Sequence, residues 1–346
     1  MNNFRLKYKE KISSLSFFHL LRLAKTIFKS PRGSINNGII KVMFNLTYRC
    51  QCSCDYCWCS RYEKNTTEEL SLAEVKRTVD QIAQRSSLFT LVSFVGGEPL
   101  LREDIYQIVK YATKRGLFVE METNGVLLSE SCVLKLKSSG LNHIFVRIEG
   151  SDETAHDSVS HCPGCFKLAI EGIRRCLRAG LSCSIFANAS REKIRNGQVE
   201  RIIDLAKRLR VNSVRVIYPT LAGGWINAEN QRLSAEEEAK VAALLEPGFV
   251  YLESTGSCSK GSSRSCAALQ KKFFHISCYG EIQPCPFVPL SFGNIRQRDL
   301  NEIVNGMFRH PVFYEGYNNC LMNDPDFRRK YILPAELWAC YRNIVL

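Results

Sequence analysis

Between residues 39 and 225 the chain alternates short runs rich in β-branched and aromatic residues with longer amphipathic stretches. Six runs predict strands: 39–46, 89–95, 117–123, 143–149, 181–187 and 212–218. The stretches between them predict helices. Ser71 precedes one helix with Glu74 three places on, the pattern of a capping box, and Gly116, Gly140 and Gly180 follow three others. Strands separated by helices pair in parallel through right-handed crossovers. We therefore expect an α/β core, as an open sheet or a partly closed barrel, with its chemistry at the carboxyl ends of the strands.

The stretch CQCSCDYCWC, residues 50–59, directly follows the first predicted strand and should lie at that edge. Its Cys50, Cys54 and Cys57 form a C-x3-C-x2-C pattern with an aromatic residue before the last cysteine. Three thiolates on one loop can hold a four-iron, four-sulfur cluster by three irons and leave the fourth iron open, as a catalytic metal site needs. A zinc site is the alternative for such closely spaced cysteines.

The chain has 16 cysteines, and its N-terminus lacks an apolar run followed by a small-residue cleavage site. This combination argues against a disulfide scaffold and for metal or iron-sulfur ligation in a reducing cytoplasm. Cys52 and Cys59 fall outside the three-cysteine spacing, so we interpret them as non-ligands. No run of eighteen uninterrupted apolar residues occurs, so we expect no membrane span.

A second motif makes the cysteine pattern more specific: Gly-Gly-Glu-Pro at positions 96–99 follows the second predicted strand. In this order the two motifs resemble those of the radical S-adenosylmethionine (radical SAM) enzymes, over about residues 40–225. The resemblance implies a partial (β/α)6 TIM-type barrel and a [4Fe-4S] cluster with an open iron site on Cys50, Cys54 and Cys57. It also implies S-adenosylmethionine as cofactor, reductively cleaved to a 5'-deoxyadenosyl radical that abstracts hydrogen from a substrate. Zinc would explain neither the glycine-rich turn nor the six βα units.

The same resemblance implies cofactor contacts from the ends of the second and third strands: Gly96, Gly97, Glu98, Pro99, Thr123 and Asn124. An ordinary Asn-Gly turn is the alternative at positions 124 and 125. After the fourth strand, many members of the family carry Ser-x-Asp-Gly, whereas this chain has Arg147, Ile148, Glu149 and Gly150. We expect Glu149 to accept hydrogen bonds from the ribose hydroxyls and Arg147 to pair with the cofactor carboxylate. No catalytic side chain is predicted.

A second cysteine-rich region contains Cys266, Gly280 and Cys285 in a C-x13-G-x4-C pattern, followed by Gly-Asn-Ile at 293–295. This pattern resembles the opening half of the SPASM domain and its shorter relative, the twitch domain, which bind auxiliary iron-sulfur clusters. A β-hairpin over residues 276–285 would bring distant ligands together. A full SPASM domain continues with a further run of cysteines, and no such run follows Cys285. We therefore expect one auxiliary iron-sulfur cluster.

The expected ligands of this auxiliary cluster are Cys258, Cys266, Cys285 and Cys320. For the fourth position, Cys278 and Cys340 are less favoured alternatives to Cys258, and chance clustering of buried cysteines is the alternative to a cluster. A further C-x2-C pair, Cys162 and Cys165, is interpreted as structural, with a redox dithiol or thiol hydrogen donor as the alternative.

Three segments follow from these patterns. We expect residues 1–38 to form a basic amphipathic helical extension, residues 39–240 the radical SAM core barrel, and residues 241–346 a smaller α+β SPASM/twitch-like domain. Residues 1–40 carry eight lysines and arginines against one glutamate, a net charge of +7 out of +13 for the chain. Such a helix can lie on an anionic membrane surface, or cap the barrel with a solvated basic face. No recognition motif accompanies the charge, so we expect no nucleic-acid partner.

The predicted function is a radical SAM enzyme that modifies a ribosomally made peptide or a small-molecule natural-product or cofactor precursor. The two substrate classes are favoured nearly equally, because only about forty residues precede the first strand and a peptide-recognition domain needs about eighty. An external electron donor of flavodoxin or ferredoxin type is expected. The alternative from another class is a non-enzymatic iron-sulfur electron-transfer or sensor protein, which would need no open iron. The predicted location is the cytoplasm, with the inner membrane face as a peripheral alternative.

If residues 1–38 lie on a membrane, deleting them should abolish co-sedimentation with anionic vesicles, because each basic residue near such a surface contributes about 1 kcal/mol. Sedimentation of the full and shortened chains with phosphatidylserine-containing and neutral vesicles measures this. Equal binding of the two chains would remove the membrane interpretation.

Overall fold

The computed structural model describes residues 39–61, 68–85, 89–253, 266–317, 320–332 and 344–345. The predictions for residues 1–38, Cys258 and Cys340 lie outside these residues. Within them, none of the helices has the length and apolar character needed to cross a bilayer.

One sheet of nine strands forms the centre of the molecule, in the order β7-β6-β5-β4-β3-β2-β1-β8-β9. The strands are β1 (Ile39–Asn45), β2 (Phe89–Val95), β3 (Phe118–Thr123), β4 (His143–Arg147), β5 (Cys183–Asn188), β6 (Val214–Ile217), β7 (Val250–Leu252), β8 (Phe273–Ile276) and β9 (Ile282–Gln283). All neighbouring strands pair in parallel except β8 and β9, which form an antiparallel hairpin. The six predicted strands and the predicted hairpin are thus confirmed.

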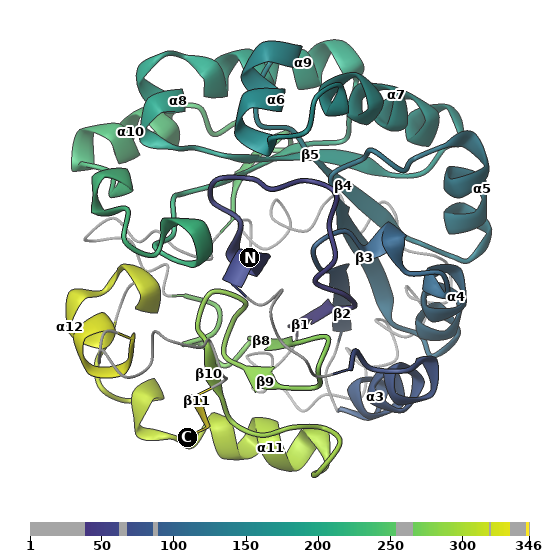
Figure 1. Cartoon of the computed structure of the whole chain (residues 1–346), viewed down its shortest axis with the longest axis vertical. Helices are drawn as coiled ribbons and strands as arrows, with labels where there is room; N and C mark the ends of the chain where they lie inside the picture. The colour runs from purple at the N-terminus through teal and green to yellow at the C-terminus, as the bar shows by residue number, and fades with distance from the viewer. Residues whose placement is uncertain are drawn as a thin grey trace.

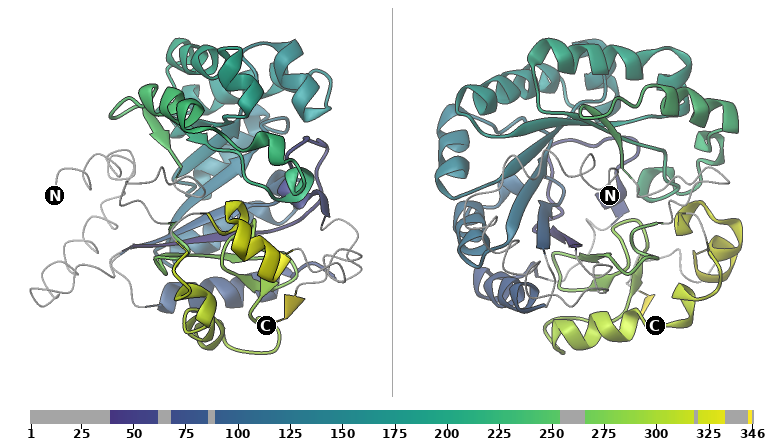
Figure 2. Two further views of the ribbon diagram at one scale, coloured as in Figure 1. Left: turned by 90° about the vertical axis from the view of Figure 1, so that its left-hand side faces the viewer. Right: turned by 180° about the vertical axis from the view of Figure 1, so that it is seen from behind.

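Helices cover the outer face of this curved sheet and surround it as a partial ring (Figure 1). They are α3 (Leu72–Gln84), α4 (Ile105–Lys114), α5 (Glu130–Ser138), α6 (Glu153–Ser160), α7 (Cys165–Arg178), α8 (Arg191–Arg195), α9 (Gln198–Leu209) and α10 (Ala235–Ala243). The C-terminal elements are α11 (Leu300–Met307), α12 (Pro325–Phe327), β10 (Leu290–Ser291) and β11 (Ile344–Val345). They fill the remaining part of the ring, which is seen from two further sides in Figure 2. The architecture is the predicted partial α/β barrel with a C-terminal unit.

The alternation of side chains along each strand separates an apolar outer core from a polar interior. On β1, Val42 and Phe44 are fully buried in the core beneath the helices. Lys41, on the opposite face, forms an ion pair with Glu120 of β3 across the intervening strand β2, with 3.0 Å between Nζ and Oε1. Because a contact over a neighbouring strand can form only on the concave face, these charged side chains lie inside the barrel.

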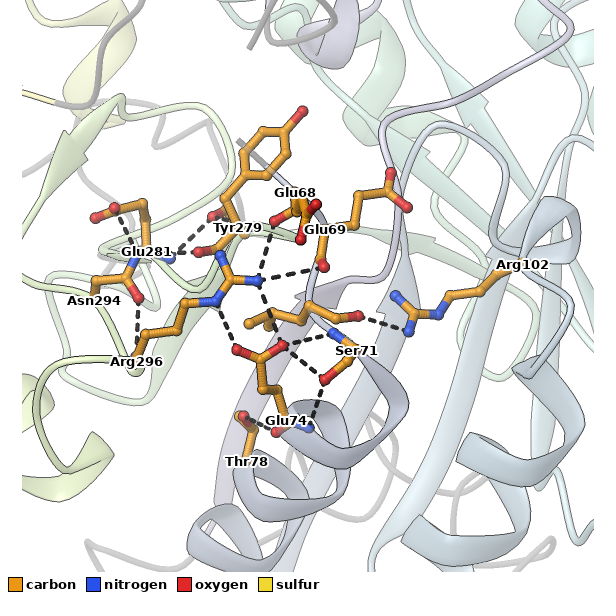
Figure 3. A network of polar contacts seen from close by, with 12 residues as sticks. Glu68, Glu69, Ser71, Glu74, Thr78, Arg102, Tyr279, Glu281, Asn294 and Arg296 are labelled. Atoms are coloured by element: carbon orange, nitrogen blue, oxygen red, sulfur yellow. Dashed lines mark hydrogen bonds and ion pairs between the residues drawn. The ribbon is translucent and has the colours of Figure 1, made fainter. Parts of the chain in front are cut away.

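The C-terminal unit continues the barrel sheet, because β8 pairs directly with β1. A second contact joins it to α3, where Arg296 forms an ion pair with Glu74 at 2.7 Å and donates hydrogen bonds to the carbonyl oxygens of Glu68 and Glu69 (Figure 3). The hydrogen bond from Arg296 is the main cause that lowers the pKa of Glu74, to about 2. The same glutamate and Ser71 form the predicted capping box of α3.

The buried Arg102 holds the chain on both sides of the first cysteine loop. Its guanidinium donates hydrogen bonds to the carbonyl oxygens of Leu46, at 2.9 Å, and Leu70, at 2.7 Å, and forms an ion pair with Asp104. Leu70 in turn donates its backbone N–H to the carbonyl of Cys278 in the C-terminal unit, at 2.7 Å. Arg102 therefore connects the end of β1 with the contact between the two parts of the chain.

Replacing Arg102 with Met should lower the free energy of unfolding by about 3 kcal/mol, because two buried carbonyl groups and Asp104 lose their partner. Denaturant unfolding measures this change. Arg115→Met is the matched control, since Arg115 pairs with Asp80 on the surface and its loss should have little effect. A small effect of Arg102→Met, equal to that of the control, would contradict this role.

Candidate active site at the carboxyl ends of the strands

The first cysteine loop, residues 46–61, leaves β1 at the carboxyl edge of the sheet and is held by backbone contacts from two sides. The N–H groups of Ser53 and Asp55 donate to the carbonyls of Ser160 and Val159 at the end of α6, at 3.1 and 3.3 Å. On the other side, Gly224 donates to the carbonyl of Cys57 at 3.1 Å. A Cβ at Gly224 would lie 2.0 Å from the carbonyl oxygen of Asp55, so this close approach requires glycine.

Cys50, Cys54 and Cys57 lie on this loop as partly buried thiols that form no disulfide. Burial raises the pKa of Cys54 to about 12, and the charges of Cys57, Glu149 and Cys50 add to this effect. The thiolate charges therefore lie close enough to repel one another. Bound iron ions would relieve this repulsion, and three such thiols are the donor set that an iron-sulfur cluster with one open iron requires. The residues present therefore fit the predicted cluster.

The two remaining cysteines of the stretch occupy different surroundings. Cys59 is buried, and its thiol donates a hydrogen bond to the carbonyl oxygen of Gly96 at 3.2 Å. Cys52 is also buried, and its backbone N–H points at the sulfur of Cys50, 3.4 Å away. The side chain of Cys52 also contacts Cys50, and that of Cys59 contacts Cys57, so the interpretation of Cys52 and Cys59 as non-ligands stays a prediction.

The glycine-rich turn after β2 packs directly on the backbone of the cysteine loop. Gly97 donates its N–H to the carbonyl of Thr47, and Glu98 to that of Arg49, both at 2.8 Å. A Cβ at Gly97 would lie 2.3 Å from the carbonyl oxygen of Arg49, so no other residue fits without moving the loop. The turn thus fixes the position of the loop relative to β2. Pro99 follows it, buried at the start of a 3-10 turn.

The carboxylate of Glu98 links this turn to the end of β3. It accepts hydrogen bonds from the Thr123 hydroxyl at 2.8 Å, from the Asn124 backbone N–H at 2.9 Å and from the Leu100 N–H at 3.0 Å. Burial raises the pKa of Glu98 to about 7, although these bonds oppose the shift. The Asn124 side chain donates to the sulfur of Cys50 at 3.7 Å. The structure therefore brings together the cysteine loop and the residues predicted after β2 and β3.

At the end of β4, Glu149 accepts hydrogen bonds from three side chains. Tyr56 of the cysteine loop donates its hydroxyl at 2.5 Å, Arg147 lies 3.3 Å away, and Lys193 of α8 forms a close ion pair. Burial opposes ionisation of Glu149, but Lys193 and Arg147 outweigh it and lower its pKa. The sequence analysis missed Lys193, because a lysine inside a short helix has no motif of its own.

Arg147 lies between the rings of Tyr56 and Phe186, with its guanidinium carbon 5.3 and 4.4 Å from their centroids. Its partner in the structure is Glu149. The predicted pairing of Arg147 with the cofactor carboxylate and the predicted ribose contact of Glu149 stay predictions. Both side chains lie at the same strand end, beside the cysteine loop.

Cys266, Cys285 and Cys320, the expected auxiliary ligands, are all buried. Burial raises the pKa of Cys285, and the charges of Cys266 and Cys320 raise it further, so the three thiols are neighbours. By contrast, Cys278 packs with Tyr48 and Cys59 beside the first cysteine loop. This placement disfavours Cys278 as the fourth ligand.

An aromatic contact joins the two cysteine sets. Trp58, next to Cys57, has its ring 6.5 Å from that of Phe287, two residues after Cys285, and 5.5 Å from that of His275 on β8. The two loops therefore meet on the interior side of the β1 and β8 pair. The C-x2-C pair does not reach this region through Cys165, whose thiol is buried against Ser160 and Asp157. Cys162, by contrast, lies close enough to the first cysteine loop for its charge to raise the pKa of Cys52. The structural interpretation of the pair stays a prediction.

Comparison with known proteins identifies the class. The family model for the radical SAM superfamily matches residues 44–189, and the model for the SPASM iron-sulfur cluster-binding domain matches residues 266–323. The chain belongs to the radical SAM superfamily and carries a SPASM domain. It is an enzyme whose domains imply a [4Fe-4S] cluster, S-adenosylmethionine and auxiliary iron-sulfur ligation.

Two curated relatives differ in what they make. The AdoMet-dependent heme synthase of Methanosarcina barkeri is 26% identical over 78% of this chain and 83% of its own length. The PqqA peptide cyclase of Rhodopseudomonas palustris is 28% identical over 71% of this chain and 67% of its own length. Among solved structures, Streptococcus suis SuiB bound to precursor peptide SuiA is similar in fold, with a TM-score of 0.63 and 16% identity over 81% of this chain and 66% of SuiB.

Replacing Cys50, Cys54 and Cys57 together with Ala should remove about four irons per chain and abolish S-adenosylmethionine cleavage, since no open-iron site remains. Iron analysis and 5'-deoxyadenosine formation after anaerobic reconstitution measure this. Cys52→Ala is the matched control and should keep both. Retained cleavage in the triple variant, or the same loss in the control, would contradict the ligand assignment.

Proposed function

We propose that Cys50, Cys54 and Cys57 hold the radical SAM cluster and that the surrounding strand ends hold S-adenosylmethionine. This proposal rests on two observations. The charges of Cys57 and Cys50 raise the pKa of Cys54, so the three thiols are neighbours, and Gly97 in the glycine turn bonds to the backbone of the same loop. When bound, the cluster and cofactor supply an electron and the deoxyadenosyl radical that abstracts hydrogen from the substrate. The protein binds and orients these groups.

The contributions of this chain's own residues differ by strand end. Glu98 accepts a hydrogen bond from the backbone N–H of Asn124, and the two residues hold the walls of the cofactor site in place. Glu149 is kept ionised by Lys193 and Arg147, and at the carboxyl end of β4 its oxygens can accept hydrogen bonds from the ribose hydroxyl groups of the cofactor. Tyr56 and Phe186 enclose Arg147 and limit the access of water.

We also propose a single auxiliary cluster, held by Cys266, Cys285 and Cys320 with Cys258 as the fourth ligand. The mutual influence of the three described thiols supports it. The reductant of the first cluster is an external flavodoxin or ferredoxin, as an enzyme of this class requires. A peripheral contact of residues 1–38 with an anionic membrane belongs to the same proposal.

The substrate is a ribosomally made peptide or a small-molecule precursor, and each class has its own support. Similarity to the heme synthase favours a tetrapyrrole precursor, and similarity to the PqqA cyclase favours a peptide. Fe-coproporphyrin III, which appears in the name of another relative, Fe-coproporphyrin III synthase, is a probe that distinguishes the two substrate classes. Its addition should stimulate 5'-deoxyadenosine formation and change the mass of the porphyrin if this chain is a tetrapyrrole enzyme. Unchanged porphyrin would favour the peptide.

Anaerobic reconstitution should give about eight irons per chain, and dithionite with S-adenosylmethionine should release 5'-deoxyadenosine. Cys285→Ala should lower the iron content to about four while cleavage of S-adenosylmethionine continues, because the two cysteine sets are separate. About four irons and no cleavage in the unaltered chain would contradict the proposed function.

A further inference from the structure

The interior face of the barrel carries charged side chains at two depths. The strand registers align Glu120 with His143 and Glu122 with Phe145, so both glutamates share the inward face of β3. Glu120 is fully buried, whereas Glu122 is partly exposed. Since helices cover the outer face of β3, the exposed surface of Glu122 opens into the barrel.

The deeper charges satisfy one another. Lys41 pairs with Glu120 at 3.0 Å and with Glu253 at 3.6 Å, and Arg215 pairs with Glu253 at 2.9 Å and with Glu120 at 3.9 Å. Two cations thus balance two carboxylates from opposite sides of the barrel. They offer little unbalanced positive charge to an anionic ligand.

Glu122 has no such partner. Within the described part of the chain it forms neither a hydrogen bond nor an ion pair. Burial and the charge of Glu120 raise its pKa, while the charges of Lys41, Arg147 and Arg215 lower it, so these charged side chains lie near its carboxyl group. A largely buried carboxyl group that accepts no hydrogen bond and forms no close ion pair is costly unless a ligand supplies such a contact.

Further polar groups and an apolar wall accompany Glu122. The buried Ser93, on the inward face next to Glu120, has a hydroxyl without a partner in the described residues, and the same holds for the side-chain oxygen of Asn188 on β5. Beside them, Phe145, Phe186 and Ile217 form an apolar cluster. Unpaired polar groups next to an apolar wall are typical of ligand sites.

We propose that Glu122 binds a protonated amine or guanidinium group of the substrate inside the barrel. This inference rests on the proposed function and names the chemistry of its substrate. Glu122 directly precedes Thr123 and Asn124, and Asn124 reaches the sulfur of Cys50. A cationic group held by Glu122 would place the neighbouring carbon atoms between this carboxylate and the radical-generating loop. A charge-assisted hydrogen bond then selects cationic over neutral or anionic substrates.

The test compares three probes of similar shape on the reconstituted holoprotein: phenethylammonium, 2-phenylethanol and 3-phenylpropionate. The aromatic ring suits the apolar wall, and only the polar end differs. We expect the ammonium to bind at least about tenfold more tightly than the alcohol, and the carboxylate most weakly. Equilibrium dialysis under anaerobic conditions gives the dissociation constants. Equal binding of ammonium and alcohol, or preference for the carboxylate, would overturn the proposal without any variant.

Substitution then locates the preference. Glu122→Gln should remove it while leaving alcohol binding unchanged, and Glu122→Asp should restore part of it. Glu171→Gln on the exposed face of α7 is the matched control and should keep it in full. A preference that survives Glu122→Gln would place the cation elsewhere and overturn the assignment. Deoxyadenosine release by the same preparations separates this failure from failure of the proposed function, which would abolish cleavage in the unaltered chain.

Discussion

The buried carboxylate of Glu98 is the interaction on which the site depends. Its backbone N–H bonds to the loop after β1, it stands at the end of β2, and its oxygens accept from the end of β3. Three strand ends are therefore fixed by one residue. Burying the Glu98 carboxyl group is costly and raises its pKa. The hydrogen bonds from Thr123, Asn124 and Leu100 offset that cost. The cysteine loop has its shape because Gly97 allows the backbones to approach.

A second set of contacts makes the two cysteine regions one structural unit. Arg102 holds the carbonyls at both ends of the first loop region, and Leu70 bonds to Cys278 in the C-terminal unit. Trp58 and Phe287 pack between the two cysteine sets. Because β8 also pairs with β1, the strand that carries the first loop borders the C-terminal unit along its length. The position of one cysteine set therefore constrains the other.

Much of this arrangement could be predicted from the sequence because local patterns encode it. The alternation of strands and helices predicted the six parallel strands β1 to β6, and the spacing of Cys50, Cys54 and Cys57 singled out their loop. The capping box of Ser71 and the hairpin predicted over residues 276–285 were also confirmed. Each of these features involves residues close in sequence, where helix periodicity, turn chemistry or ligand spacing decides the outcome.

Long-range pairing could not be predicted in this way. The sequence analysis ended the βα pattern near residue 225, whereas β7 extends the sheet and β8 joins its other side. Lys193 and Tyr56 contact Glu149 from distant segments. Glu120 is fully buried and ion-paired, whereas Glu122, two residues further along the same strand, is partly exposed and forms no close ion pair in the described residues. Such contacts depend on barrel closure, which brings opposite strands together without leaving a motif in either one.

Electron paramagnetic resonance of the dithionite-reduced, reconstituted protein tests the central claim most directly. The account predicts two overlapping [4Fe-4S] signals, of which one shifts when S-adenosylmethionine is added, because the cofactor binds the open iron of the first cluster only. The second signal should be unaffected. A single signal, or two signals that both ignore S-adenosylmethionine, would contradict a radical SAM site on Cys50, Cys54 and Cys57.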